Sequence, residues 1–239
     1  MTIAHIASQG ASNTASNATS VTCAFPGNVT AGSLIQIMVG SEKFSVDDSV
    51  AGDCTKSAGT ATIDTPALDA QVQIGNGYWA VLFSALVTGS GSLTMQVANF
   101  PASTNLAMYV DEFSGSWDGT RAEDTDARGD NNGVIAPISN AMTSAGAALF
   151  IGVARDSAGT FTVSGDYTAV AAEVQQTHAI YRIVTGGTTD SVEWTAPTGG
   201  SWALASAVYK EAAGGGIALD DTGWSPTEPQ SNPLTISVW

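Results

Sequence analysis

The sequence predicts an all-β protein: a jelly-roll-like β-sandwich built from two similar halves and followed by a C-terminal extension. Three observations lead to this prediction. Short apolar or alternating runs are separated by Gly, Ser, Thr, Asn and Asp, which is typical of strands joined by turns. No segment keeps a helical apolar period over three turns with capping residues at its ends, so we expect little helix. Several runs also recur in the same order later in the chain, which indicates an internal repeat.

Four runs in the first part of the chain are predicted strands. Residues 34–39 and 78–87 are almost continuously apolar, and the second of these ends at a Thr-Gly-Ser-Gly turn. Residues 93–97 alternate between apolar and polar side chains, and residues 106–113 form a further mainly apolar run. Continuous apolar runs of this length, bounded by turn residues, favour strands that are buried on both faces.

The internal repeat relates these strands to the second part of the chain. Matching segments lie at 31–39 and 145–154, at 44–46 and 161–163, at 52–55 and 165–168, at 86–89 and 183–186, and at 106–110 and 204–209. Two arrangements fit the repeat: two small sandwiches in tandem, or one larger sandwich whose halves share a core. We favour the second, because the joining segment 116–132 is polar and the second half is short.

The predicted organisation is a β-sandwich over residues 1–211, with halves at about 21–115 and 133–211. The Gly-rich segment 212–216 reads as a flexible hinge, and residues 217–239 form a C-terminal extension.

The extension contains three prolines, two tryptophans and a final run that alternates apolar and polar residues. Burial of the two indole rings offsets only part of the entropy that is lost when such a segment becomes ordered. We therefore expect it to gain backbone pairing as well, as a strand added to a sheet edge of its own domain or of a neighbouring subunit. The predicted partner-binding anchors are Trp224, Leu234, Ile236, Val238 and Trp239.

The charge balance excludes two classes of partner. The formal net charge is −15, with 7 basic residues against 22 acidic ones. Nucleic acids and anionic membranes both require clustered Lys and Arg, so we expect neither as a partner. The N-terminal residues lack the pattern of a signal peptide, so we expect the chain to fold in the cytoplasm of the host that makes it, with Cys23 and Cys54 reduced.

The sequence offers no constellation that indicates catalysis. It lacks a Gly-x-Ser-x-Gly nucleophile motif, a phosphate-binding loop and zinc-type cysteine spacing. The remaining reactive candidates are the two histidines and four carboxylates near strand ends: His5, His178, Asp47, Asp48, Asp111 and Glu112. No pattern singles out any of them, so we predict that the protein is not an enzyme and that it has no catalytic, cofactor or metal site.

The acidic segment 123–133 allows two interpretations. Asp124, Asp126, Asp130 and Asn132 have a spacing similar to that of calcium ligands. However, Arg128 lies among them, and no glutamate closes the segment. We favour a solvated loop between the two halves.

Carbohydrate binding is the alternative function. Sandwich lectins place exposed aromatic rings beside Asp and Asn on loops, and Trp117 and Trp202 are the candidate glycan contacts. The competing interpretation is that these rings pack in the core or across strands, where aromatic residues are favoured.

The order of turns and strands carries a resemblance. An Ala-Gly turn, an apolar strand, a Gly-Asp turn, a strand ending in Val-Thr-Gly and a strand ending in an aromatic residue and Gly, as at 110–115, follow one another. Over roughly residues 21–211 this order resembles the Gly/Ala/Thr-rich β-sandwich modules common among virion proteins of tailed bacteriophages. The chain departs from the pattern at Cys54, where an aromatic residue is expected, and in its C-terminal extension.

The resemblance implies a structural role in the virion: capsid decoration, a head fibre or a tail component. The expected partners are other virion proteins, meaning capsid or tail subunits, and further copies of the chain itself. The carbohydrate-binding alternative would place the chain in a phage tail or receptor-binding protein.

Overall fold

The computed structural model describes residues 2–42, 53–75, 77–100, 104–117, 122–130, 137–157, 162–195 and 200–212. Within these ranges the chain forms strands and turns but no helix, and the strands pair in antiparallel fashion. The predicted all-β class is therefore confirmed, and the sheets stack as expected of a β-sandwich. No helix among the described residues is long and apolar enough to cross a membrane.

The first half is built on a seven-stranded sheet. Its centre consists of the predicted apolar runs, which are buried along most of their length because both faces of the sheet are covered. The strands are β1 (Ala4–His5), β2 (Ala11–Ala18), β10 (Thr104–Ser114), β4 (Leu34–Glu42), β8 (Tyr78–Gly89), β7 (Ala67–Gln73) and β6 (Thr62–Ile63).

The second half is built on a five-stranded sheet with an equivalent centre. Its order is β11 (Asp124–Asp130), β19 (Trp202–Lys210), β13 (Ala148–Asp156), β16 (Thr177–Val184) and β15 (Thr168–Ala169). Every residue of β13 is buried, as expected for a strand covered on both faces.

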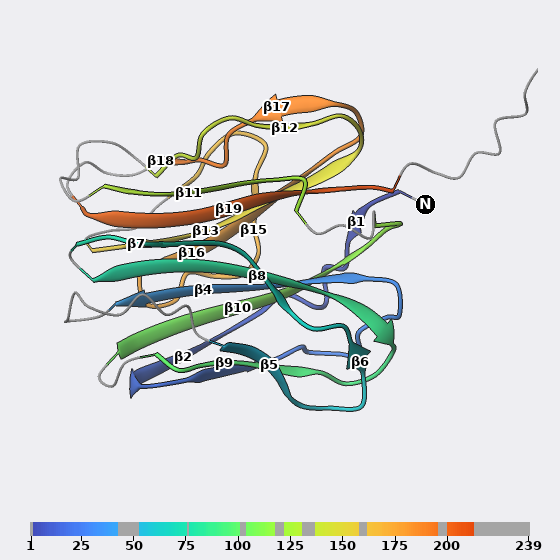
Figure 1. The fold of residues 1–239 in the computed structure, drawn as a ribbon, viewed down its shortest axis with the longest axis horizontal. Helices are drawn as coiled ribbons and strands as arrows, with labels where there is room; N and C mark the ends of the chain where they lie inside the picture. Colours follow the sequence, from blue (N-terminus) through green and yellow to red (C-terminus); the bar gives the residue numbers. More distant parts are fainter. Residues whose placement is uncertain are drawn as a thin grey trace, which may run out of the picture.

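Smaller sheets cover the outer faces of the two large ones, so that the molecule has four layers (Figure 1). The sheet of β3 (Val21–Ala24), β9 (Thr94–Ala98) and β5 (Asp53–Ala58) belongs to the first half. Two two-stranded sheets belong to the second half: β12 (Met142–Ser144) with β17 (Thr188–Asp190), and β14 (Thr162–Val163) with β18 (Trp194–Thr195).

The two halves have the same strand arrangement. The order β2-β10-β4-β8-β7 in the first large sheet corresponds to β11-β19-β13-β16-β15 in the second. Segments matched in the sequence repeat fall on strands at corresponding positions: β4 and β13, β8 and β16, and β10 and β19. The strands before residues 21 and 133, β2 and β11, join these large sheets as their edges.

Three buried apolar clusters hold the layers together. One lies inside the first half, between its large and small sheets, and another lies in the corresponding place in the second half. The third lies between the two large sheets and includes Met38 and Tyr109 from one half and Ile151 and Tyr209 from the other. Each half thus has a core of its own in addition to the shared core expected from the sequence.

One expectation is wrong. The acidic segment, expected to be a loop between the halves, forms strand β11 over Asp124–Asp130. It is a strand because all of its residues pair with β19, from Asp124 opposite Val208 to Asp130 opposite Trp202. Pairing with a buried neighbour overrides the low strand propensity of Asp and Gly.

Candidate functional site

A chain of three polar side chains joins the N-terminal strand to the second half. Nε2 of His5 lies 3.0 Å and 2.9 Å from the two carboxylate oxygens of Asp111. The hydroxyl of Tyr181 lies 2.8 Å from Nδ1 of the same ring. The ring of Phe113 packs against both His5 and Tyr181, with centroids 5.3 Å and 5.2 Å away. Asp111 is fully buried, whereas His5 and Tyr181 are partly exposed.

This arrangement has the geometry of a nucleophile, a base and an orienting carboxylate, but not their chemistry. The two ring nitrogens of His5 bond to different partners, Nε2 to the carboxylate of Asp111 and Nδ1 to the hydroxyl of Tyr181. Burial is the largest effect on Tyr181, and together with the charge of Asp111 it raises the pKa of the phenol, which disfavours a tyrosinate nucleophile. Burial also raises the pKa of Asp111, against the opposing effect of His5. The cluster is suited to holding the halves together.

A second polar cluster lies at the end of the shared core where β4 and β13 finish. Arg155 has only 3% of its side chain exposed, and its Nη2 donates to Oε2 of Glu42 at 3.0 Å. The guanidinium carbon lies 5.9 Å from the centroid of the Tyr78 ring. Burial lowers the pKa of the Arg155 guanidinium and is the largest effect on it. The negative charge of Glu42 is the largest effect in the opposite direction, followed by those of Tyr78 and Asp156.

His178 lies beside this arginine. Its Nε2 is 3.5 Å from Oε1 of Glu173, and its ring is buried. Burial, with the positive charge of Arg155 as the smaller cause, lowers the pKa of His178 to about 4. The imidazole is therefore neutral at pH 7, where the Arg155–Glu42 pair supplies the local charge.

Two buried tyrosines form further ties between the large sheets. The hydroxyl of Tyr109 on β10 donates to the carbonyl of Thr177 and accepts the backbone N–H of Val174 at 3.0 Å. The hydroxyl of Tyr209 on β19 donates to Oδ2 of Asp69 on β7 at 2.6 Å. Burial raises the pKa of both phenols, so both keep their donor proton.

The carboxylates considered from the sequence do not converge. Asp111 and Glu112 are neighbours on one strand and so point to opposite faces of the sheet. Glu112 is buried on its own side, where Oε1 accepts the backbone N–H of Thr30 at 2.7 Å. Asp47 and Asp48 lie outside the described residues. In the part of the chain that the structure describes, no group of three His, Cys, Asp or Glu side chains is placed to hold a metal ion.

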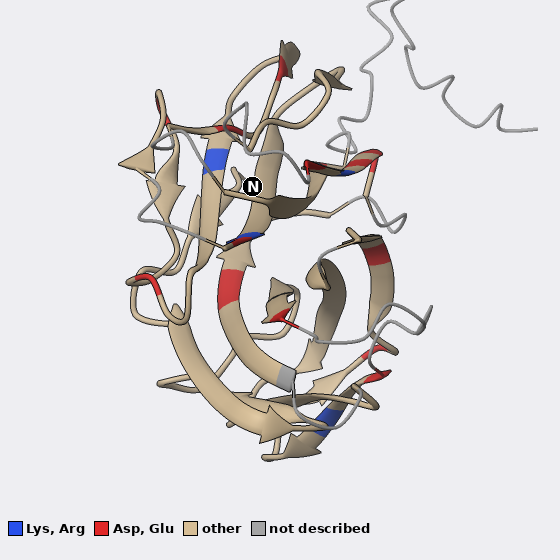
Figure 2. Ribbon diagram, turned by 90° about the vertical axis from the view of Figure 1, so that its left-hand side faces the viewer, with Lys and Arg blue, Asp and Glu red and all other residues tan. Residues whose placement is uncertain are grey.

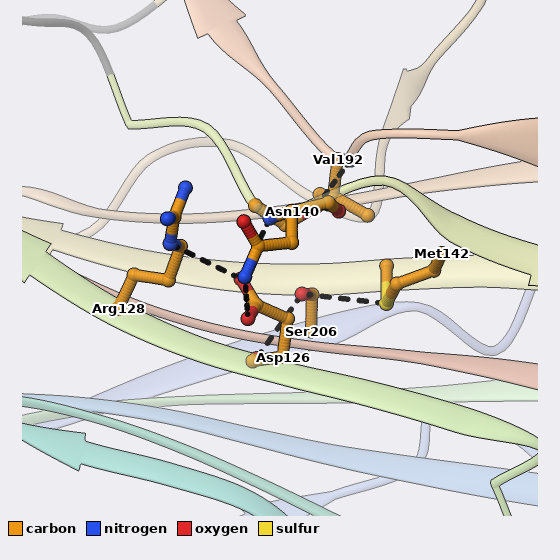
Figure 3. A network of polar contacts seen from close by, with 7 residues as sticks. Asp126, Arg128, Asn140, Met142, Val192 and Ser206 are labelled. Carbon is orange, nitrogen blue, oxygen red and sulfur yellow. Dashed lines mark hydrogen bonds and ion pairs between the residues drawn. The ribbon is translucent and has the colours of Figure 1, made fainter.

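The side chains considered as calcium ligands bind protein groups instead (Figure 3). Asp126 accepts the backbone N–H of Asn140 at 2.8 Å and its side-chain amide at 2.9 Å. Arg128 lies 3.7 Å from the same carboxylate. Asp124 accepts the backbone N–H of Thr143 at 3.3 Å. Asn132 lies outside the described residues.

The two candidate glycan contacts occupy different environments. Trp202 is 3% exposed and packs in the cluster inside the second half, so its ring is not presented on the surface. Trp117 is half-buried, at an isolated bridge to Glu211 and close to Gly115 and Ile3.

A cavity of about 190 Å³ lies on the first half, lined by Gln71, Val72, Gln73 and Trp79 of β7 and β8. Neither Trp117 nor Trp202 lines it. The structure therefore does not bring the two predicted aromatic contacts together at this cavity.

The predicted anchors Trp224, Leu234, Ile236, Val238 and Trp239 lie outside the described residues, as do the hinge from residue 213 and the extension. The two cysteines are free thiols. Burial raises the pKa of Cys23 to about 11 and that of Cys54 to about 12, which keeps both in the less reactive thiol form.

Acidic positions are spread over strands and turns on both halves, and basic positions are few (Figure 2). In comparisons with known proteins, no family model, curated protein or solved structure matches this chain.

Proposed function

We propose that this chain is a structural virion protein of a tailed bacteriophage, specifically a capsid decoration protein, that attaches to neighbouring subunits through its faces and termini. The observation that carries the proposal is the position of the polar clusters. The contacts of His5, Arg155, Tyr109 and Tyr209 all tie one half to the other. Such ties favour a rigid double sandwich, which suits a protein that acts through shape and attachment. The assignment to a phage rests on the resemblance in the order of turns and strands.

The test is binding to phage heads that lack this protein. The full chain is compared with a chain that lacks residues 217–239, which leaves every described strand intact. We expect the full chain to sediment with the heads and the shortened chain to stay in solution. Failure of the full chain to bind heads or any other virion component would contradict the proposal.

Carbohydrate binding is the second candidate. Two separate features favour it: the half-buried ring of Trp117, and the amide-lined cavity at Gln71 and Gln73, which Trp117 does not line. A glycan array probed with the full chain tests it. Binding that is lost in Trp117→Ala would support this candidate, and a silent array would contradict it.

A further inference from the structure

The large sheets end in edges that differ in how well they are protected. Exposed edges invite pairing with other chains, and proteins block them with charges, bulges, short strands or covering segments. Strand β15 is only two residues long. Strand β7 has a register shift between Leu68 and Ala70, and its Asp69 is bound by Tyr209 of the other half. Strand β11 carries three aspartates and an arginine.

Strand β2 is the remaining long edge, and it has none of these charges. Its sequence is Ala-Ser-Asn-Thr-Ala-Ser-Asn-Ala. It pairs with β10 in regular register from Ala11 to Ala15, and a register shift follows only at its end. Among the described residues no other strand pairs with its outer side. The edge is therefore uncharged in a protein whose net charge is −15.

The hydrogen bond of Thr14 shows which way the backbone of β2 faces. Its N–H donates to Oδ1 of the preceding Asn13 at 2.9 Å instead of to β10. Because alternate residues of an antiparallel strand bond to the same neighbour, the backbone groups of Ser12 and Thr14 point to the open side. Ser12 therefore presents its N–H and C=O groups to an added strand, and Thr14 presents its C=O group. The N–H of Thr14 would exchange its bond to Asn13 for one to that strand.

Strand β11, the counterpart of β2, has a similar local geometry but different surroundings. The N–H of Thr125 donates to Oδ1 of Asp124 at 2.9 Å, as that of Thr14 does to Asn13. In β11, however, Asp126 holds Asn140 through two hydrogen bonds, so a neighbouring segment is tied over the strand (Figure 3). Strand β2 also holds neighbours: Nδ2 of Asn13 donates to the carbonyl of Thr22 on β3 at 2.7 Å, and Oγ of Ser16 accepts from Nε2 of Gln175 at 3.2 Å. The two edges differ in charge, because β11 carries three aspartates and an arginine whereas β2 carries no charged side chain.

The side chains along β2 also indicate what kind of strand fits beside it. Ala11, Ala15 and Ala18 are half-buried against the core of the first half, so mainly small methyl groups border this core at the edge, with Asn13 between Ala11 and Ala15 bound to the carbonyl of Thr22. A strand with large apolar side chains on alternate positions would extend the core there. Residues 234–239, Leu-Thr-Ile-Ser-Val-Trp, have this alternation and no charged side chain.

We infer that the open edge of β2 receives residues 234–239 of a second copy of this chain by strand addition, an inference that rests on the proposed attachment function. Leu234, Ile236 and Val238 would face the side on which Ala11 and Ala15 border the core. The 21 residues of the segment 213–233 connect this strand to the described fold. They span up to about 70 Å when extended, enough to reach a neighbouring molecule.

Two blocking variants test the inference by complementation. Thr14→Pro removes an N–H that does not pair with β10, and proline is tolerated at such edge positions. Ile236→Asp places a charge in the donated strand. Each variant alone should remain monomeric in sedimentation velocity runs, because one lacks a receptive edge and the other a competent donor. An equimolar mixture should form a one-to-one dimer and nothing larger.

The matched control is Thr125→Pro, which removes the corresponding N–H from the guarded edge β11. It should associate like the unmodified chain. Thr14→Lys is a second variant that blocks the β2 edge, by placing a charge at this exposed position while the backbone N–H stays in place. It should weaken association by about tenfold or more. Thermal melting shows whether each variant is folded.

The outcomes separate the inference from the function on which it rests. A mixture of the two blocking variants that stays monomeric overturns pairing between copies. Association that neither block weakens overturns the role of β2 while leaving attachment in place. An unmodified chain that neither self-associates nor binds phage particles contradicts both.

Discussion

Residues that lie far apart in the chain tie the two halves together through buried polar contacts. His5 contacts Asp111 and Tyr181, which lie 106 and 176 positions away. Arg155 is almost fully buried against Glu42. A buried ion pair is costly to break, because removal of one partner leaves the other charge without compensation. These contacts therefore fix how one half sits on the other.

The buried histidine of this boundary predicts an acid-sensitive stability. The pKa of His178 is lowered from 6.5 to about 4. Between these values the unfolded chain binds a proton that the folded chain does not, so the free energy of unfolding falls as the pH is lowered. A shift of this size is worth about 3 kcal/mol. Urea unfolding at about pH 7 and about pH 4.5 should show a smaller loss of stability for His178→Gln than for the unmodified chain. Equal losses of stability in the two proteins would show that His178 is not the group responsible for the acid sensitivity.

The two thiols should react slowly in the folded protein. Their raised pKa values, about 11 for Cys23 and about 12 for Cys54, leave little thiolate near pH 8. Relative to an ordinary thiol, the thiolate fraction is lower by about a hundredfold or more. Reaction with a thiol-specific reagent should therefore be at least that much faster in denaturant than in buffer. A rapid reaction of either cysteine in the folded chain would show that its surroundings are more open.

Among the secondary-structure elements, the strands with continuous apolar runs were predictable from the sequence. The runs at 34–39, 78–87 and 106–113 are all found within buried strands. Strands β2 and β11 were not predictable from the sequence, because Ala-Ser-Asn-Thr and Asp-Thr-Asp-Ala carry no apolar alternation. They are strands because they pair with β10 and β19, and that pairing is a property of the fold.

The contacts of the candidate site were predictable only in part, for the same reason. The sequence places His5 in an alternating segment, but nothing in its local pattern reveals Asp111 and Tyr181 as its partners. Those contacts exist because β1 pairs with β10 and the two large sheets face each other.

The close approach of the large sheets predicts the effect of a single methyl group on β4. A Cβ atom at Gly40 would lie 2.4 Å and 2.5 Å from side-chain atoms of Thr177, which is fully buried and whose carbonyl is bound by Tyr109. Gly40→Ala should therefore destabilise the protein by about 1–3 kcal/mol. Gly146→Ala is the control, because nothing lies within 4 Å of its Cβ position. Equal stability of the two variants in urea unfolding would show that the sheets can move apart without cost.

At the scale of the whole molecule, two sandwich halves with their own cores share a third core between their large sheets. The sequence repeat predicted two similar halves, and the two large sheets share a strand order, β2-β10-β4-β8-β7 in one and β11-β19-β13-β16-β15 in the other. The sequence could not reveal that each half keeps a separate core, because the small sheets that complete those cores include strands of only two or three residues.

The net charge of −15 predicts how association between copies depends on salt. Copies with the same large charge repel one another, and added ions screen this repulsion. Self-association should therefore strengthen as the salt concentration rises from about 0.02 M to about 0.3 M. Weaker association at the higher salt concentration would indicate that opposite charges hold the copies together, in contrast to strand pairing between uncharged segments.

The most direct test of attachment is the mass of the full chain in solution, measured by light scattering as its concentration is raised, alone and with phage heads. We expect species larger than one chain, or binding to the heads, and loss of the larger species in Thr14→Pro but not in Thr125→Pro. A chain that stays monomeric at every concentration and ignores the heads would contradict it.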